Sequence, residues 1–175
     1  MWPIGPLMHE HRLIERMIAL MAAEAQRLRG GGELDRGFLG AAVEFIRSYA
    51  DRCHHGKEED ILFKDLAGRD LAPELGALMQ ELIEDHKYGR SLVGRLVSAR
   101  EAGDRGQCIA ILEELAEFYP RHIEKEDKHF FFPCMELFGR QEKDAMLAAF
   151  YEFDRHLIHE HFRAVVEGLE KQPRR

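Results

Sequence analysis

Residues 54–63 read HHGKEEDILF, and residues 122–131 read HIEKEDKHFF. The two stretches agree at the first histidine, at the lysine three residues later and at the two acidic residues that follow it. Each contains a His-x-x-x-Glu pair, His54 with Glu58 and His122 with Glu126. On an α-helix, residues four apart share one face and lie about 6 Å apart along the axis. Both side chains of each pair can therefore reach one metal ion or two neighbouring ions.

A single histidine precedes each pair at a distance that suits a helical hairpin. Residues 10–12 read EHR and residues 85–87 read DHK, in each case an acid, a histidine and a base. His11 and His54 are 43 residues apart, and His86 and His122 are 36 apart, so one helix can run out and the next can return. A repeat of metal-capable residues is harder to obtain by chance than one motif. The chain is thus predicted to contain two helical hairpins that carry the same set of side chains.

Apolar residues recur at intervals of three and four along residues 7–28, 34–63, 73–103, 104–132 and 141–169. Three consecutive glycines at 30–32 interrupt the first pattern, and Pro73 suits the first turn of the third. Neither period-two alternation nor an Asn-Gly or Asp-Gly turn indicates a strand. The predicted fold is all-α: an up-down-up-down four-helix bundle at about residues 6–136, with an additional C-terminal helix at about residues 141–170. Residues 1–175 are expected to form a single domain.

The composition argues against several classes of protein. The 175-residue chain has a formal charge of −7 and lacks the cationic face that contacts with nucleic-acid phosphates need. No stretch approaches 18 uncharged apolar residues, and the N-terminus lacks a secretory signal, so we expect no membrane contact and a cytoplasmic location. The three cysteines, Cys53, Cys108 and Cys134, form no Cys-x-x-Cys pair and are expected to be reduced thiols. The chain is expected to be a monomer or a homodimer, and no motif identifies a protein partner.

The four repeated histidines and the two glutamates form a ligand set for metal ions. Imidazole binds iron, zinc or copper, carboxylates can bridge two metals, and the lack of thiolate ligands disfavours structural zinc. The set therefore suits a non-haem di-iron centre, with other divalent metals as alternatives. Ferritin-like di-iron bundles are the nearest rival, but they need two Glu-x-x-His pairs. This chain has only Glu126 and His129 at that spacing.

At Glu10–Ile14, His54–Phe63, Asp85–His86 and His122–Glu126, the chain resembles the hemerythrin HHE cation-binding family. The resemblance extends over nearly the whole chain. It implies a bundle that holds two iron ions joined by an oxo or hydroxo bridge. By the same resemblance Glu58 and Glu126 bridge the irons, His11 and His54 bind one iron, and His86 and His122 bind the other.

One position departs from the family pattern. Hemerythrins that carry oxygen have a fifth histidine one turn before the position of His86, and this chain has Leu82 there. The missing imidazole leaves an open coordination position, a water or a substitute ligand from elsewhere. In the predicted C-terminal helix, His156 and His159 are the candidates for a substitute ligand. The remaining histidines are expected to lie outside the metal site: His9, His55, His129 and His161.

The resemblance implies a protein that binds or reacts with a small oxidant or diatomic molecule, O2, peroxide or NO, at a carboxylate-bridged iron site. If the protein is an enzyme, it is expected to be a peroxide- or NO-reactive di-iron oxidoreductase, and its catalytic residues stay unassigned. The alternative is a non-catalytic iron or oxygen sensor, a metal-binding regulatory module. A storage site for other divalent metals is a third reading. Sequence patterns do not choose among these functions.

Overall fold

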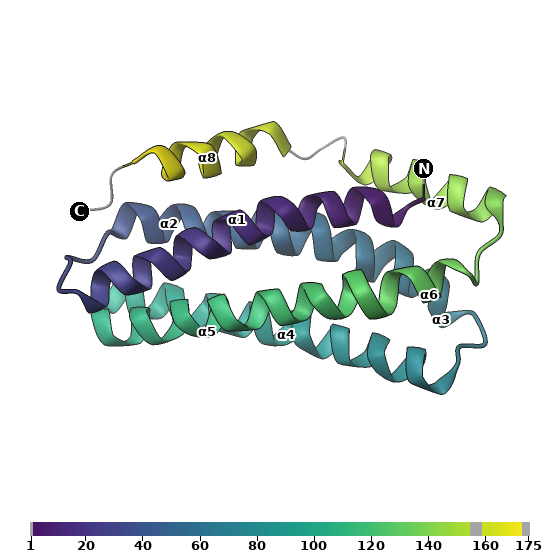
Figure 1. The fold of residues 1–175 in the computed structure, drawn as a ribbon, viewed down its shortest axis with the longest axis horizontal. Helices are drawn as coiled ribbons and strands as arrows, with labels where there is room; N and C mark the ends of the chain where they lie inside the picture. Colours follow the sequence, from purple (N-terminus) through teal and green to yellow (C-terminus); the bar gives the residue numbers. More distant parts are fainter. Residues whose placement is uncertain (1, 155–158, 173–175) are drawn as a thin grey trace.

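The computed structural model describes residues 2–154 and 159–172. Four helical rods run back and forth along one another and form the predicted bundle (Figure 1). The first rod is α1 (Ile4–Arg29), and the third is α4 (Pro73–Ala102). The second rod consists of α2 (Arg36–Phe45), η1 (Ile46–His55), η2 (Glu58–Phe63) and α3 (Lys64–Ala67). The fourth consists of α5 (Arg105–Glu124), η3 (Lys125–Phe130) and α6 (Phe131–Met135). Within the described ranges no strand occurs, so the all-α prediction is confirmed.

Local signals explain where the rods begin and end. Asp35 and Asp104 each precede a helix, and their carboxylates accept hydrogen bonds from the backbone N–H groups of Phe38 (2.8 Å) and Gln107 (3.0 Å). These bonds satisfy donors that a helix N-terminus otherwise leaves unpaired. Gly103 ends α4 with a φ of 69°, a left-handed conformation that disfavours residues with a Cβ atom. The turns between the rods are therefore encoded locally.

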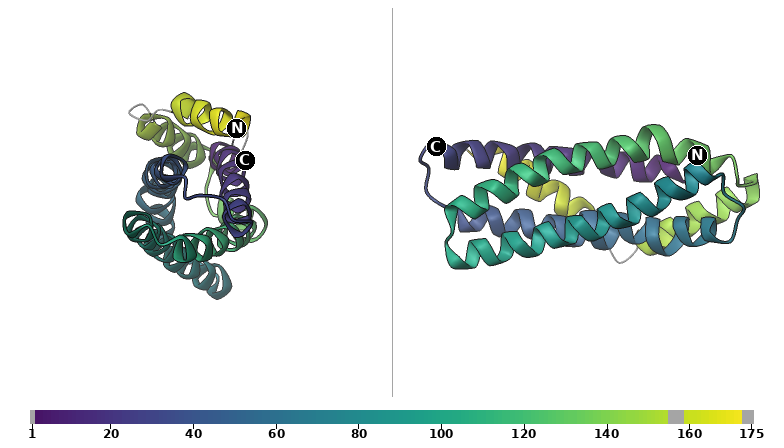
Figure 2. Two further views of the ribbon diagram at one scale, coloured as in Figure 1. Left: turned by 90° about the vertical axis from the view of Figure 1, so that its left-hand side faces the viewer. Right: turned by 90° about the horizontal axis from the view of Figure 1, so that it is seen from below.

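The rods form a closed ring, as the end-on view in Figure 2 shows. The α5 helix packs along both α1 and α4, and the second rod lies against α4 and α1. Each rod thus contacts the rod before it and the rod after it in the chain, and the first contacts the last. This connectivity is the predicted up-down-up-down order.

Apolar side chains fill the bundle in two separate clusters. On the first rod Leu7 belongs to one cluster and Ile14 to the other, and on the third rod Leu82 and Leu92 divide in the same way. Buried polar residues lie between the two clusters on every rod, among them His11 and His86. Burying charged groups without partners is costly, so a polar layer in the middle of a core requires a specific reason.

Three segments of the second and fourth rods, η1, η2 and η3, are π-helical. The wider turn of a π-helix interrupts the regular α-helical hydrogen bonds and is often found at functional sites. All three segments lie at the level of the buried polar layer, and they contain His54, His55, Glu58 and Glu126. The backbone is therefore irregular at the positions where the predicted metal ligands lie.

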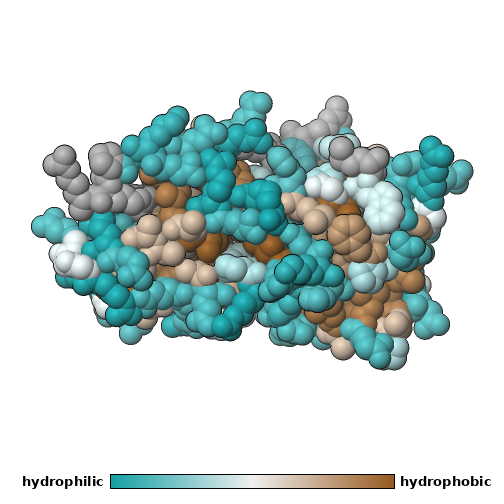
Figure 3. Space-filling view, viewed as in Figure 1, coloured by the Kyte–Doolittle hydropathy of each residue, from teal (hydrophilic) through white to brown (hydrophobic). Residues whose placement is uncertain are grey.

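The additional C-terminal helical region is confirmed. The described residues form two helices there, α7 (Arg140–Asp154), which packs against η2, and α8 (His159–Lys171), which packs against α1 and α2. The face shown in Figure 3 is largely hydrophilic, with one apolar area toward the end of the bundle where α6 and the first turns of α4 lie and another in the opposite half. Within residues 2–154 and 159–172, no helix combines the length and the apolar run that crossing a bilayer requires.

Candidate metal centre

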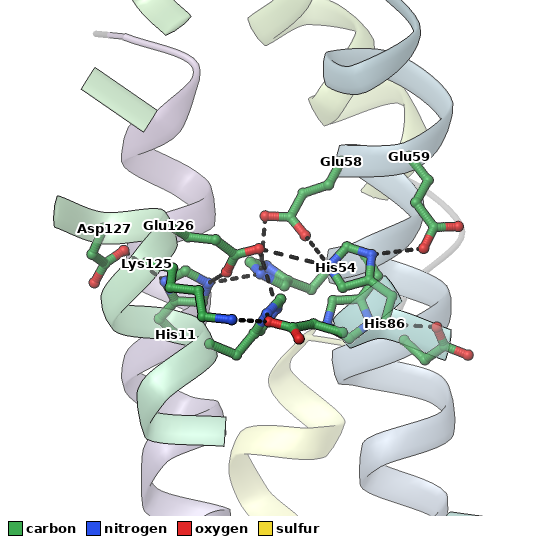
Figure 4. A network of polar contacts seen from close by, with 12 residues as sticks. His11, His54, Glu58, Glu59, His86, Lys125, Glu126 and Asp127 are labelled. Atoms are coloured by element: carbon green, nitrogen blue, oxygen red, sulfur yellow. Dashed lines mark hydrogen bonds and ion pairs between the residues drawn. The ribbon is translucent and has the colours of Figure 1, made fainter. Parts of the chain in front are cut away.

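The polar layer contains two adjacent groups of potential metal ligands. The first consists of His11, His54, Glu58 and Glu126, all buried, each of which offers a nitrogen or oxygen atom within 4.8 Å of the others. His11 Nε2 lies 2.8 Å from His54 Nε2 and 3.1 Å from Glu126 Oε2. His54 Nε2 lies 3.5 Å from Glu58 Oε1. Two imidazoles and two carboxylates from three rods thus face one point (Figure 4).

The second group consists of His55, His86 and His122, which are also buried. The His55 and His86 rings stack with their centroids 3.9 Å apart. The two glutamates face this group as well, because Glu58 Oε2 lies 3.4 Å from His86 Nε2 and Glu126 Oε1 lies 3.1 Å from His122 Nε2. Glu58 and Glu126 therefore stand between the two histidine groups, where a carboxylate can bind a metal on either side.

Several atoms at the centre of this layer have no hydrogen-bond partner in the described structure. They are both carboxylate oxygens of Glu58, both carboxylate oxygens of Glu126, and the Nε2 atoms of His86 and His122. A buried polar atom left without a partner costs about 1–3 kcal/mol. Six such atoms directed at one small region are the arrangement expected of a site that binds metal ions.

On the outer side of the layer, each histidine has a carboxylate near its Nδ1 atom. The distances are 2.7 Å for His11 and Asp127, 2.9 Å for His54 and Glu10, 2.7 Å for His86 and Glu59, 3.3 Å for His122 and Asp85, and 3.4 Å for His55 and Asp51. The first four pairs are hydrogen bonds, in which Nδ1–H donates to the carboxylate, whereas His55 Nδ1 makes no hydrogen bond. Such bonds fix the ring orientation and leave the Nε2 lone pair for a metal.

A cation lies beyond each of these carboxylates. Arg12 pairs with Asp127, Lys57 with Glu10, Lys125 with Asp85, and Arg90 with both Asp51 and Glu59. The carboxylates thus connect an inner ring of histidines to an outer ring of positive charge. This outer ring offsets part of the negative charge that five carboxylates place close to the site.

Without metal the layer holds protons. Burial alone lowers the pKa of His11, but the hydrogen bond to Asp127 and the nearby charge of Glu126 raise it to about 9. For His122, burial is likewise outweighed by the charge of Glu126 and the bond to Asp85, and the pKa rises to about 10. Burial and the nearby charge of Glu126 raise the pKa of Glu58 well above its usual value.

Burial keeps His54 and His55 neutral. Burial, followed by the charge of His11, holds the pKa of His54 well below its usual value, and burial together with His86 does the same for His55. Protons on His11, His122 and Glu58 therefore occupy the place that metal charge would take.

A cavity of about 100 Å³ opens between η1, α4 and α5 and reaches His55. Its lining also includes the buried Tyr119 and Val93 and the exposed Arg47 and Arg90. A water molecule occupies about 30 Å³ in the liquid, so the cavity accommodates only a few small molecules. Solvent thus approaches the second group of histidines from this side.

The structure places all six predicted ligands, His11, His54, Glu58, His86, His122 and Glu126, in the two groups. His156 lies outside the described residues, and so does the side chain of His159. His9, His129 and His161 are exposed, as expected. Cys53 is buried, and burial raises the pKa of its thiol, as suits a small apolar residue.

The expectation that His55 lies outside the site is wrong, because it joins His86 and His122. Adjacent residues on a helix point about 100° apart, and the second rod lies against both α1 and α4. His54 therefore faces His11 on α1, while His55 faces His86 on α4. Leu82 is buried in an apolar cluster, whereas His55 lies with His86 and His122 in the polar layer. The doublet His54-His55, read beside Leu82, was the available signal.

Comparison with known proteins agrees with this geometry. The model of the hemerythrin HHE cation-binding domain matches residues 3–133, which include both histidine groups and both glutamates. No curated protein and no solved structure matches the chain. A match over three quarters of the chain and a buried layer of histidines and glutamates identify the same kind of module. The chain belongs to the hemerythrin HHE cation-binding family.

Proposed function

We propose that the chain binds two iron ions and uses them to bind or react with a small oxidant or diatomic molecule. His11 and His54 would hold one ion, and His55, His86 and His122 the other, with Glu58 and Glu126 shared between them. The observation that carries the proposal is the set of six unpartnered ligand atoms at the centre of the layer. Nitrogen and oxygen donors without thiolate suit iron, and carboxylates between two histidine groups suit a pair of ions.

Iron in such a site supplies electrons to O2, peroxide or NO. The two groups differ in the number of their histidines, two in the first and three in the second. The first group therefore leaves more room for an external ligand, and we expect the small molecule to bind beside His11 and His54. His55 would give the second ion a third imidazole, and the first ion would have two.

Three phenylalanine rings pack against histidines of the two groups. Phe131 stacks on His11 with ring centroids 5.7 Å apart, and Phe63 stacks on His86 at 5.9 Å. Phe118 stacks on His122 at 5.7 Å. These rings hold the imidazoles in place. Glu58 and Glu126 are fully buried, which strengthens their interaction with any cation bound there.

Metal analysis and an optical spectrum of protein from an iron-supplied host test the proposal. We expect two irons per chain, a charge-transfer band, and a change in that band when azide is added. His54→Ala should lower the iron content, while His129→Ala, a substitution of an exposed histidine, should leave it unchanged. One zinc per chain without a band would overturn the proposal.

Turnover of peroxide separates an enzyme from a sensor. The iron-loaded protein is expected to consume peroxide faster than the same concentration of free iron, and the His54→Ala variant should not. Equal rates for the protein and free iron would leave binding without catalysis, which is the behaviour of a sensor.

A further inference from the structure

Two lysines occupy equivalent positions in the two halves of the site. Lys57 lies three residues after His54, and Lys125 lies three residues after His122. Lys57 Nζ donates to Glu10, the carboxylate that accepts a hydrogen bond from His54 Nδ1. Lys125 Nζ donates at 2.7 Å to Asp85, which has the same relation to His122. Each half of the site therefore contains a chain of contacts from a histidine through a carboxylate to a lysine.

Each lysine also has a second carboxylate on its outer side, and here the halves differ. Lys57 Nζ lies 2.8 Å from Asp154 Oδ1, and Lys125 Nζ lies 2.6 Å from Glu81 Oε1. The side chain of Lys57 is 0% exposed and that of Asp154 17%, whereas the values are 28% for Lys125 and 56% for Glu81. Charges act more strongly on one another when solvent is excluded, so the Asp154 contact matters more than its counterpart.

The helix α7 is the cause of the difference. Asp154 is its last residue, and the preceding Phe153 packs so close to Gly56 that a Cβ atom there would stand 2.8 Å from the ring. The family match ends at residue 133, before α7 begins. A helix beyond the matched domain thus covers one lysine and brings a carboxylate to it.

The two carboxylates that contact Lys57 also belong to a cluster that could hold a metal. Glu10, Cys53 and Asp154 offer ligand atoms within 4.8 Å of one another. The Lys57 ammonium already contacts both Glu10 and Asp154. A cation of the chain itself therefore occupies this place. The cluster is better understood as an extension of the His54 contacts than as a separate site.

We propose that Asp154 is a positioning residue that acts through Lys57 and Glu10 on His54, and so sets how strongly this imidazole donates electrons to its metal. The inference rests on the proposed function. Asp154 shares the charge of Lys57, which leaves more negative charge on Glu10 and strengthens its hydrogen bond with His54 Nδ1–H. A carboxylate bonded to Nδ1 makes Nε2 a stronger ligand. Loss of the Asp154 charge weakens this effect and makes the metal bind anions more tightly.

The test compares Asp154→Asn with Glu81→Gln, the equivalent change in the other half of the site, in the iron-loaded full chain. Loss of the carboxylate that directly contacts a metal ligand changes metal affinity or activity about 10–100-fold. Asp154 is one residue further from the ligand, so we expect a smaller effect, a rise in azide affinity of about three- to tenfold. The reduction potential of the iron should rise as well. Glu81→Gln should change neither quantity, and Asp154→Glu, which keeps the charge, should restore wild-type values.

A second readout does not depend on iron. In the metal-free protein, Asp154→Asn should shift the NMR resonance of the His54 Nδ1–H proton, and Glu81→Gln should leave it in place. An unshifted His54 resonance, or equal effects of the two variants on azide affinity, would overturn the inference. If the wild-type chain takes up no iron, the proposed function fails, and the NMR comparison still decides whether Asp154 acts on His54.

Discussion

The substitution His55→Leu should affect stability in opposite directions with and without metal. In the metal-free protein His55 Nδ1 is buried without a hydrogen bond, which costs about 1–3 kcal/mol. Leucine removes this cost, although its different shape costs up to about 1.5 kcal/mol in packing. We therefore expect the metal-free variant to be about 1 kcal/mol more stable than the wild type, with a melting temperature about 2–4 °C higher.

With iron bound the sign reverses. Loss of a group that is hydrogen-bonded to a metal-ligating side chain weakens metal binding about 10–100-fold. Loss of the ligand itself should therefore weaken metal binding at least about 100-fold. A factor of 100 in affinity removes about 2.7 kcal/mol of the stability that bound metal confers. The loaded variant should then be about 2 kcal/mol less stable than the loaded wild type.

Thermal unfolding in the presence of a chelator and after anaerobic iron loading measures both effects, with His129→Leu as the control at an exposed histidine. Metal analysis of the same samples should give fewer than two irons per chain for His55→Leu. The reasoning would be refuted if the variant is destabilised equally in both states, or if it keeps two irons with wild-type affinity.

Three further predictions concern protons and packing. Metal binding at pH 7 should release up to three protons, from His11, His122 and Glu58. Calorimetry in buffers of different ionisation enthalpy measures this release. Binding heats that do not depend on the buffer would contradict the prediction. The metal-free protein should lose stability as pH rises from about 6.5 through 9. The pKa of His11 is about 9 in the folded chain and about 6.5 in the unfolded chain, so protonated His11 stabilises the fold fully below pH 6.5 and loses this effect as pH approaches 9. The stability contributed by protonated His11 is on the order of 3 kcal/mol. Unfolding measured at several pH values should show this loss of stability in the metal-free protein and not in the metal-loaded protein. A Cβ atom at Gly56 would stand 2.8 Å from the Phe153 ring, so Gly56→Ala should be more favourable in a Phe153→Leu background than in the wild type, and urea unfolding of the four proteins measures the difference.

The rods were predictable because their signals are local. Apolar periodicity, the glycines at 30–32 and Pro73 each act over one or two helical turns, and all of them appear where expected. The C-terminal region was predicted as one helix and contains α7 and α8 in the described residues. Spacing also brought the six predicted ligands together, because residues four apart share one face of an α-helix and the hairpin lengths return His54 to His11 and His122 to His86.

His55 and Lys57 could not be placed in this way. His55 lies in the core because the second rod packs beside α4, which brings His86 to it from a distant part of the sequence. Lys57 is fully buried although lysine is among the residues most often exposed. Its burial depends on Glu10 from α1 and Asp154 from α7, which are 47 and 97 residues away in the chain. Contacts of this kind arise only from the assembled fold.

The two halves of the centre also bear on how such a protein can originate. Each helical hairpin supplies one histidine, one His-x-x-x-Glu pair and one lysine, and each glutamate reaches the histidines of the other hairpin. A short hairpin that associates with a second copy of itself could hold two metals that its symmetry axis relates, and duplication with fusion would then produce one chain. After fusion the copies are free to diverge. His55, which matches Ile123, and α7, which covers only Lys57, are the places where this chain has made its two metal positions unequal.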